Sequence, residues 1–257
     1  MNRIIAIVNR KGGVGKTTTA VNLAATAAAA GKKTLLVDFD PQGNATTAFG
    51  ISKGNGLPSV YDVMTGLGTV RDATRQIIGA NQLGVIPSTA DLSGAEIELV
   101  NTRNREFRLR EKLKQIEQEY DWIFIDCPPS LGLLTVNALA AAHGALIPLQ
   151  CEYYAMEGLS QVLKTIEIIK KNINKSLEVE GILLTMHEYY NPRNLEIERE
   201  IRSHLGTLTY QVMIPRDPIL NTAPGFGRPG VWYHPWSPGA LAYQNLTLEM
   251  LHKELKS

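Results

Sequence analysis

The chain has 257 residues, of which 44% are hydrophobic and 20% are charged, as in an ordinary globular protein. Its 26 Lys and Arg residues nearly balance its 25 Asp and Glu residues, which excludes a protein that coats nucleic acid through uniform positive charge and leaves only a local basic patch. No apolar run approaches the roughly 18 residues of a membrane span, and the amino-terminal run is too short for a signal peptide, so we expect a cytoplasmic protein without membrane attachment.

Short apolar runs alternate with longer helical patterns along the chain. The runs predict strands at 4–9, 34–39, 83–88, 122–127, 145–150, 180–186 and 210–215. The patterns predict helices at 16–30, 104–119, 133–142, 158–172, 195–205 and 238–255. Strands that are apolar on both faces are typical of a sheet covered on each side. We therefore expect an α/β fold with a doubly wound, mostly parallel sheet and helices on both faces, in a single domain of residues 1–257.

The stretch "NRKGGVGKTTTA" at 9–20 lies between the first predicted strand and the first predicted helix. It matches the phosphate-loop pattern G-x-x-x-x-G-K-[ST] except at the first position, which is Arg10. Lys16 is expected to bind the outer phosphates of a nucleotide, and the Thr17 hydroxyl to ligate Mg²⁺. A glycine-rich turn with solvated lysines is the alternative, which the flanking strand and helix disfavour. Phosphate oxygens would lie against the backbone N–H groups of the loop residues Gly12, Gly13, Val14 and Gly15.

A second lysine, Lys11, stands at the other end of the same loop. Because Lys16 already serves the phosphates, Lys11 is useful where charge develops on the γ-phosphate during transfer. It could act within its own subunit or across a dimer interface, and its position in the sequence does not choose between the two.

Carboxylates end two of the predicted strands. Asp38 and Asp40 follow the second strand, and one of the two could simply cap the next turn. Either could instead orient water or reach Mg²⁺ through water. Asp126 ends the fourth strand, where an acid typically holds Mg²⁺ through water in phosphate-loop nucleotide sites. Because the carboxyl ends of parallel strands meet at one edge of a sheet, we expect these acids beside the loop.

The chain resembles the ParA/Soj branch of the ParA–MinD family of deviant Walker-type ATPases in six segments that occur in order: KGGVGKTTTAVNLA, LLVDFDPQGNAT, FIDCPPSLGLLTVNAL, IPLQCEYYAMEGLSQ, EGILLTM and IPRD. The resemblance implies a P-loop NTPase fold of the deviant Walker A type, with ATP and Mg²⁺ as cofactors. It also implies a homodimer that forms with ATP, in which the signature lysine, here Lys11, reaches the partner's phosphates.

Further roles are implied by the resemblance at the matching positions. Lys11, Lys16 and Asp40 are the expected catalytic residues, and Asp40 would position or activate the attacking water. Thr17, Asp40 and Asp126 are the expected residues of the metal site, with Asp126 as the Walker B carboxylate. Contacts to the nucleotide beyond the outer phosphates are expected from Thr18 at an inner phosphate and from Pro215, Arg216 and Asp217 beside the adenine.

The resemblance implies a slow ATPase switch that a ParB-like partner stimulates. In the family, ATP-bound dimers typically bind DNA nonspecifically, which would associate the protein with the nucleoid. The cycle segregates plasmids or chromosomes, or positions large cargoes. The alternative is a MinD-like, membrane-associated positioning ATPase, but that branch usually ends in an additional amphipathic helix. The final segment GALAYQNLTLEMLHKELKS instead resembles the last helix of the fold itself.

Three segments depart from the family pattern where basic residues contribute to DNA contact. PILNTAPGFGRPG lacks the usual arginine, YHPWSPGALAY lacks two usual lysines, and HEYYNPRNL is longer than its usual counterpart. Each missing cation weakens binding to phosphates, so DNA binding is reduced or has moved to another basic patch. A solvated helix face is the alternative for each candidate. The candidates on two consecutive predicted helices are Lys164, Lys170, Lys171 and Lys175, followed by Arg193, Arg199 and Arg202.

Two other classes of phosphate-loop protein are disfavoured. A redox or metallocluster ATPase needs exposed cysteines paired across a dimer, whereas Cys127 and Cys151 have no such spacing and are expected to be buried, reduced thiols. A small-molecule kinase needs a lid over its substrate, and the chain has no Arg-rich insertion that resembles one.

Overall fold

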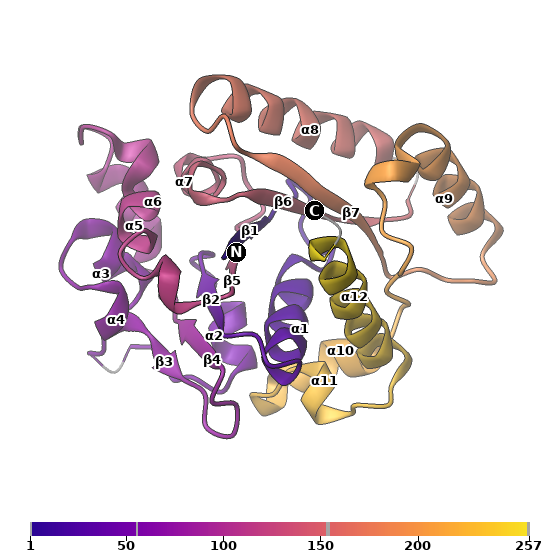
Figure 1. The fold of residues 1–257 in the computed structure, drawn as a ribbon, viewed down its shortest axis with the longest axis horizontal. Helices are drawn as coiled ribbons and strands as arrows, with labels where there is room; N and C mark the ends of the chain where they lie inside the picture. The colour runs from indigo at the N-terminus through magenta and orange to yellow at the C-terminus, as the bar shows by residue number, and fades with distance from the viewer. Residues whose placement is uncertain (1, 55, 153–154, 256–257) are drawn as a thin grey trace.

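A seven-stranded sheet forms the centre of the computed structural model, which describes residues 2–54, 56–152 and 155–255 (Figure 1). The strands lie in the order β3-β4-β2-β5-β1-β6-β7, and all neighbours are parallel except β3 and β4. This is the doubly wound, mostly parallel sheet that the sequence predicts. The strands are β1 Arg3–Ile7, β2 Thr34–Asp38, β3 Arg75–Gln76, β4 Leu83–Ile86, β5 Trp122–Asp126, β6 Gly144–Gln150 and β7 Glu178–Thr185.

The register of the central strands brings the acidic strand ends to one level. In the ladder between β1 and β5, Ile7 pairs with Asp126. In the ladder between β2 and β5, Asp38 pairs with Asp126. The chain leaves β1 immediately after Ile7 toward the glycine-rich stretch, so this stretch and both acids occupy the same edge of the sheet.

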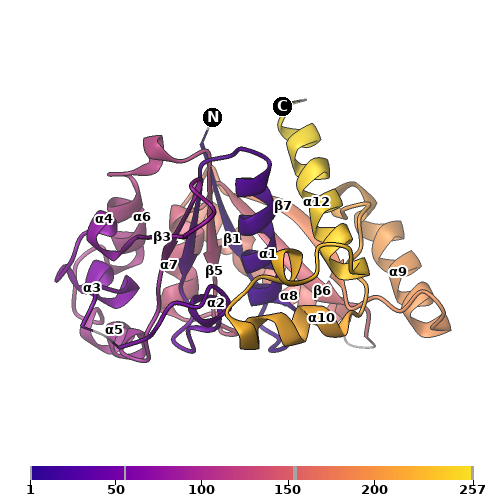
Figure 2. The same ribbon diagram turned by 90° about the horizontal axis from the view of Figure 1, so that it is seen from below.

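Helices cover both faces of the sheet, with α7 and α8 above it and α1 and α12 below it in Figure 1. The apolar side chains of α1, α2, α10, α11 and α12 form one buried core, and those of α3 to α8 form another. α9 lies at the outer side of β7 in both Figures 1 and 2. The bounds are α1 Lys16–Ala29, α2 Asn44–Ala48, α3 Val60–Thr65, α4 Val70–Ala73, α5 Leu92–Glu98, α6 Arg108–Leu113, α7 Leu133–Ala141, α8 Ala155–Asn172, α9 Pro192–Leu205, α10 Pro218–Thr222, α11 Gly230–Tyr233 and α12 Pro238–Glu254.

The last long helix, α12, supports the helix that follows the glycine-rich stretch. α1 and α12 lie side by side in both views (Figures 1 and 2). The hydroxyls of Thr26 and Thr247 lie 2.5 Å apart, and those of Thr19 and Tyr243 lie 3.0 Å apart. All four residues are buried, so these hydrogen bonds satisfy polar groups that would otherwise destabilise the interface.

The strand predicted at 210–215 is wrong. Two isolated bridges flank this region beside β7, one between Thr209 and Ile182 and one between Pro215 and His187. Between the bridges, the backbone N–H groups of Gln211 and Val212 donate to the carboxylate of Glu249 on α12, at 2.9 and 3.0 Å. The segment is therefore tied to a helix at the positions where a ladder with β7 would continue.

The helix predicted at 104–119 is wrong in its extent. Three short pieces occupy the region: the 3₁₀ turns Arg105–Phe107 and Glu117–Glu119, with α6 between them. In a continuous α-helix the amide of Leu109 would donate to the carbonyl of Arg105. Instead, Asn137 on α7 accepts from the Leu109 amide at 3.2 Å and donates to the Arg105 carbonyl at 2.9 Å.

Two remaining expectations concern the cysteines and the membrane. Cys127 and Cys151 are both buried and unpaired, as expected. Within the part of the chain that the structure describes, none of the helices combines the length and the apolar character needed to cross a bilayer.

Candidate nucleotide-binding site

The expected phosphate loop is a tight turn between β1 and α1. Gly13 and Gly15 have φ angles of 75° and 90°, a left-handed conformation that is unfavourable for residues with side chains. α1 begins at Lys16, directly after Gly15, so the unpaired N–H groups of its first turn face the loop. These groups and the helix dipole form a site of the kind that binds phosphate. The loop and this first turn also contain the other expected phosphate-binding residues, Gly12, Val14, Thr17 and Thr18.

Neighbouring strands hold the loop at both of its ends. Asn9 donates through Nδ2 to the Pro148 carbonyl of β6 at 2.7 Å. The Thr185 hydroxyl at the end of β7 donates to the Val14 carbonyl at 2.8 Å. The conformation of the loop is therefore fixed by contacts within the chain itself.

Lys16 is buried at the mouth of this loop, with 6% of its surface exposed. Its Nζ donates to the Lys11 carbonyl at 3.0 Å, across the loop. Burial lowers the pKa of Lys16, and the nearby Asp126 opposes this by favouring the charged form. The amine is thus held where phosphate oxygens in the loop would meet it.

Asp126 is a buried carboxylate with an incomplete environment. Its exposed fraction is 0%, and neither of its oxygens has a hydrogen bond to any residue in 2–54, 56–152 or 155–255. Burial raises the pKa of Asp126 well above its ordinary value, and the adjacent Asp38 raises it further. The Thr17 hydroxyl lies near the carboxylate, outside hydrogen-bond geometry, and lowers this pKa in part. A buried acid without partners is costly, and a cation at these oxygens would remove that cost.

Asp38 and Asp40 have different partners. Asp38 accepts from both the amide and the hydroxyl of Thr46 on α2, at 2.7 and 2.6 Å. Burial is the main reason why the pKa of Asp38 rises to about 6. Asp40, 7% exposed, accepts the Gln42 amide at 2.9 Å through Oδ1. Asp38 thus anchors α2, and Asp40 is the acid of this pair that can face a ligand.

Lys11 lies on the surface, unlike Lys16. Its side chain is 53% exposed and forms an ion pair with Glu152, which is 46% exposed and follows β6 in the same chain. The structure therefore places the two lysines of one loop in different environments, one buried against the strand-end acids and one at the outer rim.

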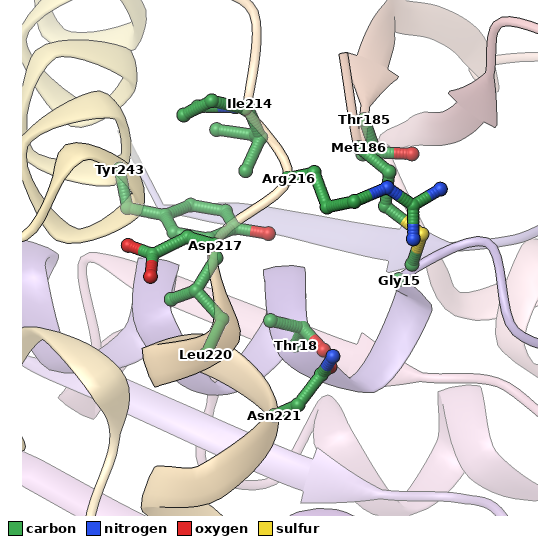
Figure 3. Close-up of a pocket in the computed structure, with 11 residues that line it drawn as sticks. Gly15, Thr18, Thr185, Met186, Ile214, Arg216, Asp217, Leu220, Asn221 and Tyr243 are labelled. Carbon is green, nitrogen blue, oxygen red and sulfur yellow. The ribbon is translucent and has the colours of Figure 1, made fainter. Parts of the chain in front are cut away.

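A pocket beside the loop contains the three residues expected near the adenine (Figure 3). Pro215, Arg216 and Asp217 form one wall of it. The Asp217 carboxylate accepts from the amides of Ile219 and Gly239, at 2.9 and 2.8 Å, and Figure 3 shows it turned toward α12. Burial raises the pKa of Asp217, but these bonds and one from Ser237 lower it overall. Asp217 therefore shapes the pocket through its structural bonds.

Sequence reasoning missed several residues that line this pocket. Thr185 and Met186 follow directly from the end of β7, and Met186 has a φ of 52°, unusual for a residue with a side chain. Both residues lie at the carboxyl end of a predicted strand, where ligands bind in such sheets, so the sequence could have indicated them. Leu220, Asn221 and Tyr243 also line the pocket, but they come from α10 and α12, and no local pattern marks them.

The basic residues expected to contact DNA lie on α8, on α9 and in the segment that follows α8. α9 lies beside the first half of α8, where His204 and Leu205 share a groove with Lys164 (Figure 1). Lys170 and Lys171 lie in the last turn of α8. Lys175, expected on the same helix, comes after its end at Asn172, which corrects that prediction.

Two of these cations are paired with acids of the same chain. Lys170 forms an ion pair with Glu178, and Arg202 forms one with Glu198 at 2.9 Å. The other five cations are exposed and form no ion pair with the residues that the structure describes: Lys164, Lys171, Lys175, Arg193 and Arg199.

Comparisons with known proteins agree with this geometry. A family model described as an AAA domain matches residues 2–179. The chain is 49% identical to the sporulation initiation inhibitor protein Soj of Bacillus subtilis over 250 residues, which cover 97% of this chain and 98% of that protein. The chain belongs to the ParA/Soj family of P-loop ATPases. This ParA/Soj-family chain is also 48% identical to the chromosome partitioning protein ParA of Myxococcus xanthus, covering 99% of this chain and 89% of that protein.

A solved structure extends the likeness to the fold of the whole ParA/Soj-family chain. The cobyrinic acid a,c-diamide synthase of Mycobacterium smegmatis, with a bound ATP analogue and magnesium, has a TM-score of 0.83 and 32% identity. The match covers 100% of this chain and 97% of that one. The fold is therefore that of P-loop NTPases.

Proposed function

We propose that this protein is an ATP-dependent dimerising switch that segregates DNA, or positions another large cargo, through slow Mg²⁺-dependent ATP hydrolysis. One relative, of Myxococcus xanthus, is a chromosome partitioning protein, and the match covers 89% of its length. We take residues 1–257 as one ATPase domain, because one sheet carries the loop, the acids and the pocket. The observation that carries the proposal is the buried Asp126 carboxylate, which lies beside the buried Lys16 and has no hydrogen-bond partner among the described residues.

In this proposal the nucleotide lies across the loop and into the adjoining pocket. Lys16 exchanges the Lys11 carbonyl for outer phosphate oxygens, which are stronger acceptors because they are charged. Thr18, which lines the pocket next to Gly15, contacts an inner phosphate. The adenine lies against Pro215 and Arg216.

The residues present fit a magnesium site. Thr17, Asp40 and Asp126 would hold Mg²⁺, which would neutralise charge on the phosphates of the nucleotide. Across the described residues no cluster of three or more His, Cys, Asp or Glu side chains could hold a metal alone, and Mg²⁺ usually takes one or two carboxylates beside substrate phosphates. Asp40 orients the attacking water, since Asp38 is committed to Thr46.

Lys11 serves the second subunit in this proposal. An exposed ion pair such as Lys11–Glu152 contributes at most about 1 kcal/mol. The triphosphate of a facing subunit is a more highly charged acceptor, so Lys11 can leave Glu152 when two ATP-bound subunits meet. There it neutralises charge on the γ-phosphate.

The ATP-bound dimer binds nonspecific DNA in this proposal, and a ParB-like protein stimulates hydrolysis. Dimerisation doubles the number of exposed cations such as Lys171, Arg193 and Arg199, and each phosphate contact adds to affinity through counterion release. The protein would then be cytoplasmic and associated with the nucleoid while bound to ATP.

The test measures molar mass by light scattering and binding to nonspecific duplex DNA across a salt series, with ATP, ADP or no nucleotide. We expect dimers and DNA binding with Mg²⁺ and ATP only, and a steep loss of binding as salt rises. A protein that stays monomeric with ATP contradicts the switch. ATP-dependent binding to anionic liposomes, without DNA binding at low salt, would favour the MinD-like alternative.

A further inference from the structure

The loop that follows β7 reaches back to the candidate base pocket. This loop and the first turn of α9 together contain the HEYYNPRNL segment, which is longer than its counterpart in the family pattern. The Arg216 amide donates to the His187 carbonyl at 3.1 Å, and the His187 amide donates to the Ile214 carbonyl at 2.9 Å. These bonds place Glu188 beside Arg216, and Arg216 Nε donates to Glu188 Oε1 at 2.6 Å.

The start of α9 holds Glu188 in place. The second carboxylate oxygen of Glu188 accepts from Asn191 Nδ2 at 3.1 Å. The backbone amide of Glu188 donates to Asn194 Oδ1 at 3.0 Å. Asn194 in turn donates to the Cys151 carbonyl after β6 at 3.1 Å. The hydrogen bond from Asn191, followed by that from Arg216, lowers the pKa of Glu188. The carboxylate is therefore charged and fixed at neutral pH.

Arg216 stands between two hollows of the surface. It lines the base pocket with Thr185 and Met186, and it also lines an outer groove with Tyr189 and Tyr190. Figure 3 shows its guanidinium directed to the side of the pocket formed by Met186 and Gly15. Since Glu188 takes the edge of the guanidinium at Nε, the flat face stays available to a ligand. Such a face stacks on aromatic rings.

We propose that Glu188 is a positioning residue for nucleotide recognition. It holds the Arg216 guanidinium over the base pocket so that the cation stacks on the purine of ATP. This inference rests on the proposed function, because it takes ATP as the ligand of the pocket. Without Glu188, the Arg216 side chain, 55% exposed, would no longer have the ion pair that orients it and would spend part of its time in solvent.

The ion pair between Glu188 and Arg216 should affect nucleotide binding more than it affects the stability of the fold. Both side chains are substantially exposed, at 55% for Arg216 and 41% for Glu188, and exposed ion pairs contribute little to stability. Variants of either residue should therefore fold, which keeps binding measurements interpretable.

The experiment measures equilibrium binding of a ribose-labelled fluorescent ATP with Mg²⁺, and its displacement by inorganic tripolyphosphate. We expect Glu188→Gln and Arg216→Met each to raise the Kd for ATP about two- to fivefold, the range of an exposed cation–π contact. Tripolyphosphate has no base, so its affinity should stay unchanged. The control Glu196→Gln removes another exposed acid from α9 and should leave both affinities unchanged.

A double variant that carries Glu188→Gln and Arg216→Met shows whether Glu188 acts through Arg216 or contacts the nucleotide independently. Because Glu188 acts through Arg216, the double variant should bind ATP no more weakly than Arg216→Met alone. The inference is overturned if Glu188→Gln binds ATP like the wild type, or weakens ATP and tripolyphosphate equally. A wild-type protein that does not bind ATP would instead overturn the proposed function on which the inference rests.

Discussion

Two regions were expected to meet polyanions: the sheet edge that carries the glycine-rich loop and the strand-end acids, and the basic helices α8 and α9. The charged side chains are buried in the first region and lie at the surface in the second. At the edge, Lys16 and Asp126 are buried, and the Asp126 carboxylate accepts no hydrogen bond from the described residues. On the helices, Lys170 and Arg202 pair with glutamates of the same chain. Buried charge without a partner is costly, so the edge indicates a missing ligand, whereas the helices are stable as they are.

The largest effect is expected at Lys16. Lys16→Ala removes the buried amine that faces the loop, and removing a charged hydrogen bond to phosphate costs about 3 kcal/mol, or roughly 100-fold or more in affinity. Isothermal titration with Mg²⁺ and ATP measures this loss. Lys33→Ala, at an exposed lysine before β2, is the matched control. Binding of ATP by Lys16→Ala at wild-type affinity would show that the edge does not hold phosphate.

Asp126→Asn should separate the stability of the chain from its ligand binding. The amide has no charge to bury, so the nucleotide-free variant should be more stable, and each 1 kcal/mol gained raises the Tm by roughly 2–4 °C for a chain of this size. Stabilisation by Mg²⁺ and ATP should largely disappear, because the metal loses a carboxylate. Thermal unfolding with and without the nucleotide measures both. A variant less stable than the wild type without nucleotide would contradict the interpretation of Asp126 as an unsatisfied charge.

The raised pKa values of these acids also predict a pH dependence. An acid whose pKa is higher in the folded chain favours folding below its unfolded pKa and loses that contribution as the pH rises through the folded value. For Asp38 this loss occurs between its ordinary pKa of 3.8 and about 6, and burial moves that of Asp126 in the same direction. The nucleotide-free chain should lose stability over this range, and Asp126→Asn should lose less. Urea unfolding at several pH values compares the two proteins.

Lys11 and Glu152 form an exposed ion pair next to the buried Lys16 and Asp126. Variants of this pair test whether an exposed charge at the loop acts on another subunit. Lys11→Ala should keep the affinity for ATP within about twofold yet reduce ATP-dependent dimerisation, since an exposed charge contributes little within its own subunit. Glu152→Gln should strengthen ATP-dependent dimerisation by up to about fivefold, because Lys11 no longer has to break an ion pair of up to about 1 kcal/mol before it reaches the other subunit. Sedimentation at several protein concentrations measures both. Normal dimerisation and hydrolysis by Lys11→Ala would refute the role across the interface.

The smallest effects are expected on the basic helices. Arg199→Ala removes an exposed cation and should weaken DNA binding and lower the salt slope by about 0.9 for each phosphate that is no longer neutralised. Arg202→Ala should change binding less, because Arg202 is engaged with Glu198. DNA titrations at several salt concentrations compare the two variants. No effect of either variant would mean that α9 does not face DNA, and an equal loss of binding would mean that the ion pair with Glu198 does not withhold Arg202 from DNA.

The sequence alone was enough to predict the core of the fold and the meeting of the glycine-rich loop with the strand-end acids at one edge of the sheet. Six of the predicted strands are present, because buried parallel strands are short apolar runs that can be recognised locally. The glycine-rich loop, Lys16 and Thr17 are contiguous, so one local motif identifies them. Asp126 was predictable because it directly ends an apolar strand.

Only the tertiary structure decided which polar groups remain available to a ligand. Thr46 occupies Asp38 and leaves Asp40 available, and Glu249 accepts the backbone N–H groups of Gln211 and Val212 in place of β7. Glu188 meets Arg216 across 28 residues of sequence. In each case a hydrogen-bond partner comes from a distant segment, and composition and periodicity describe only what neighbours along the chain have in common. The charge of a residue can be read from the sequence, but whether that charge is already satisfied depends on the fold.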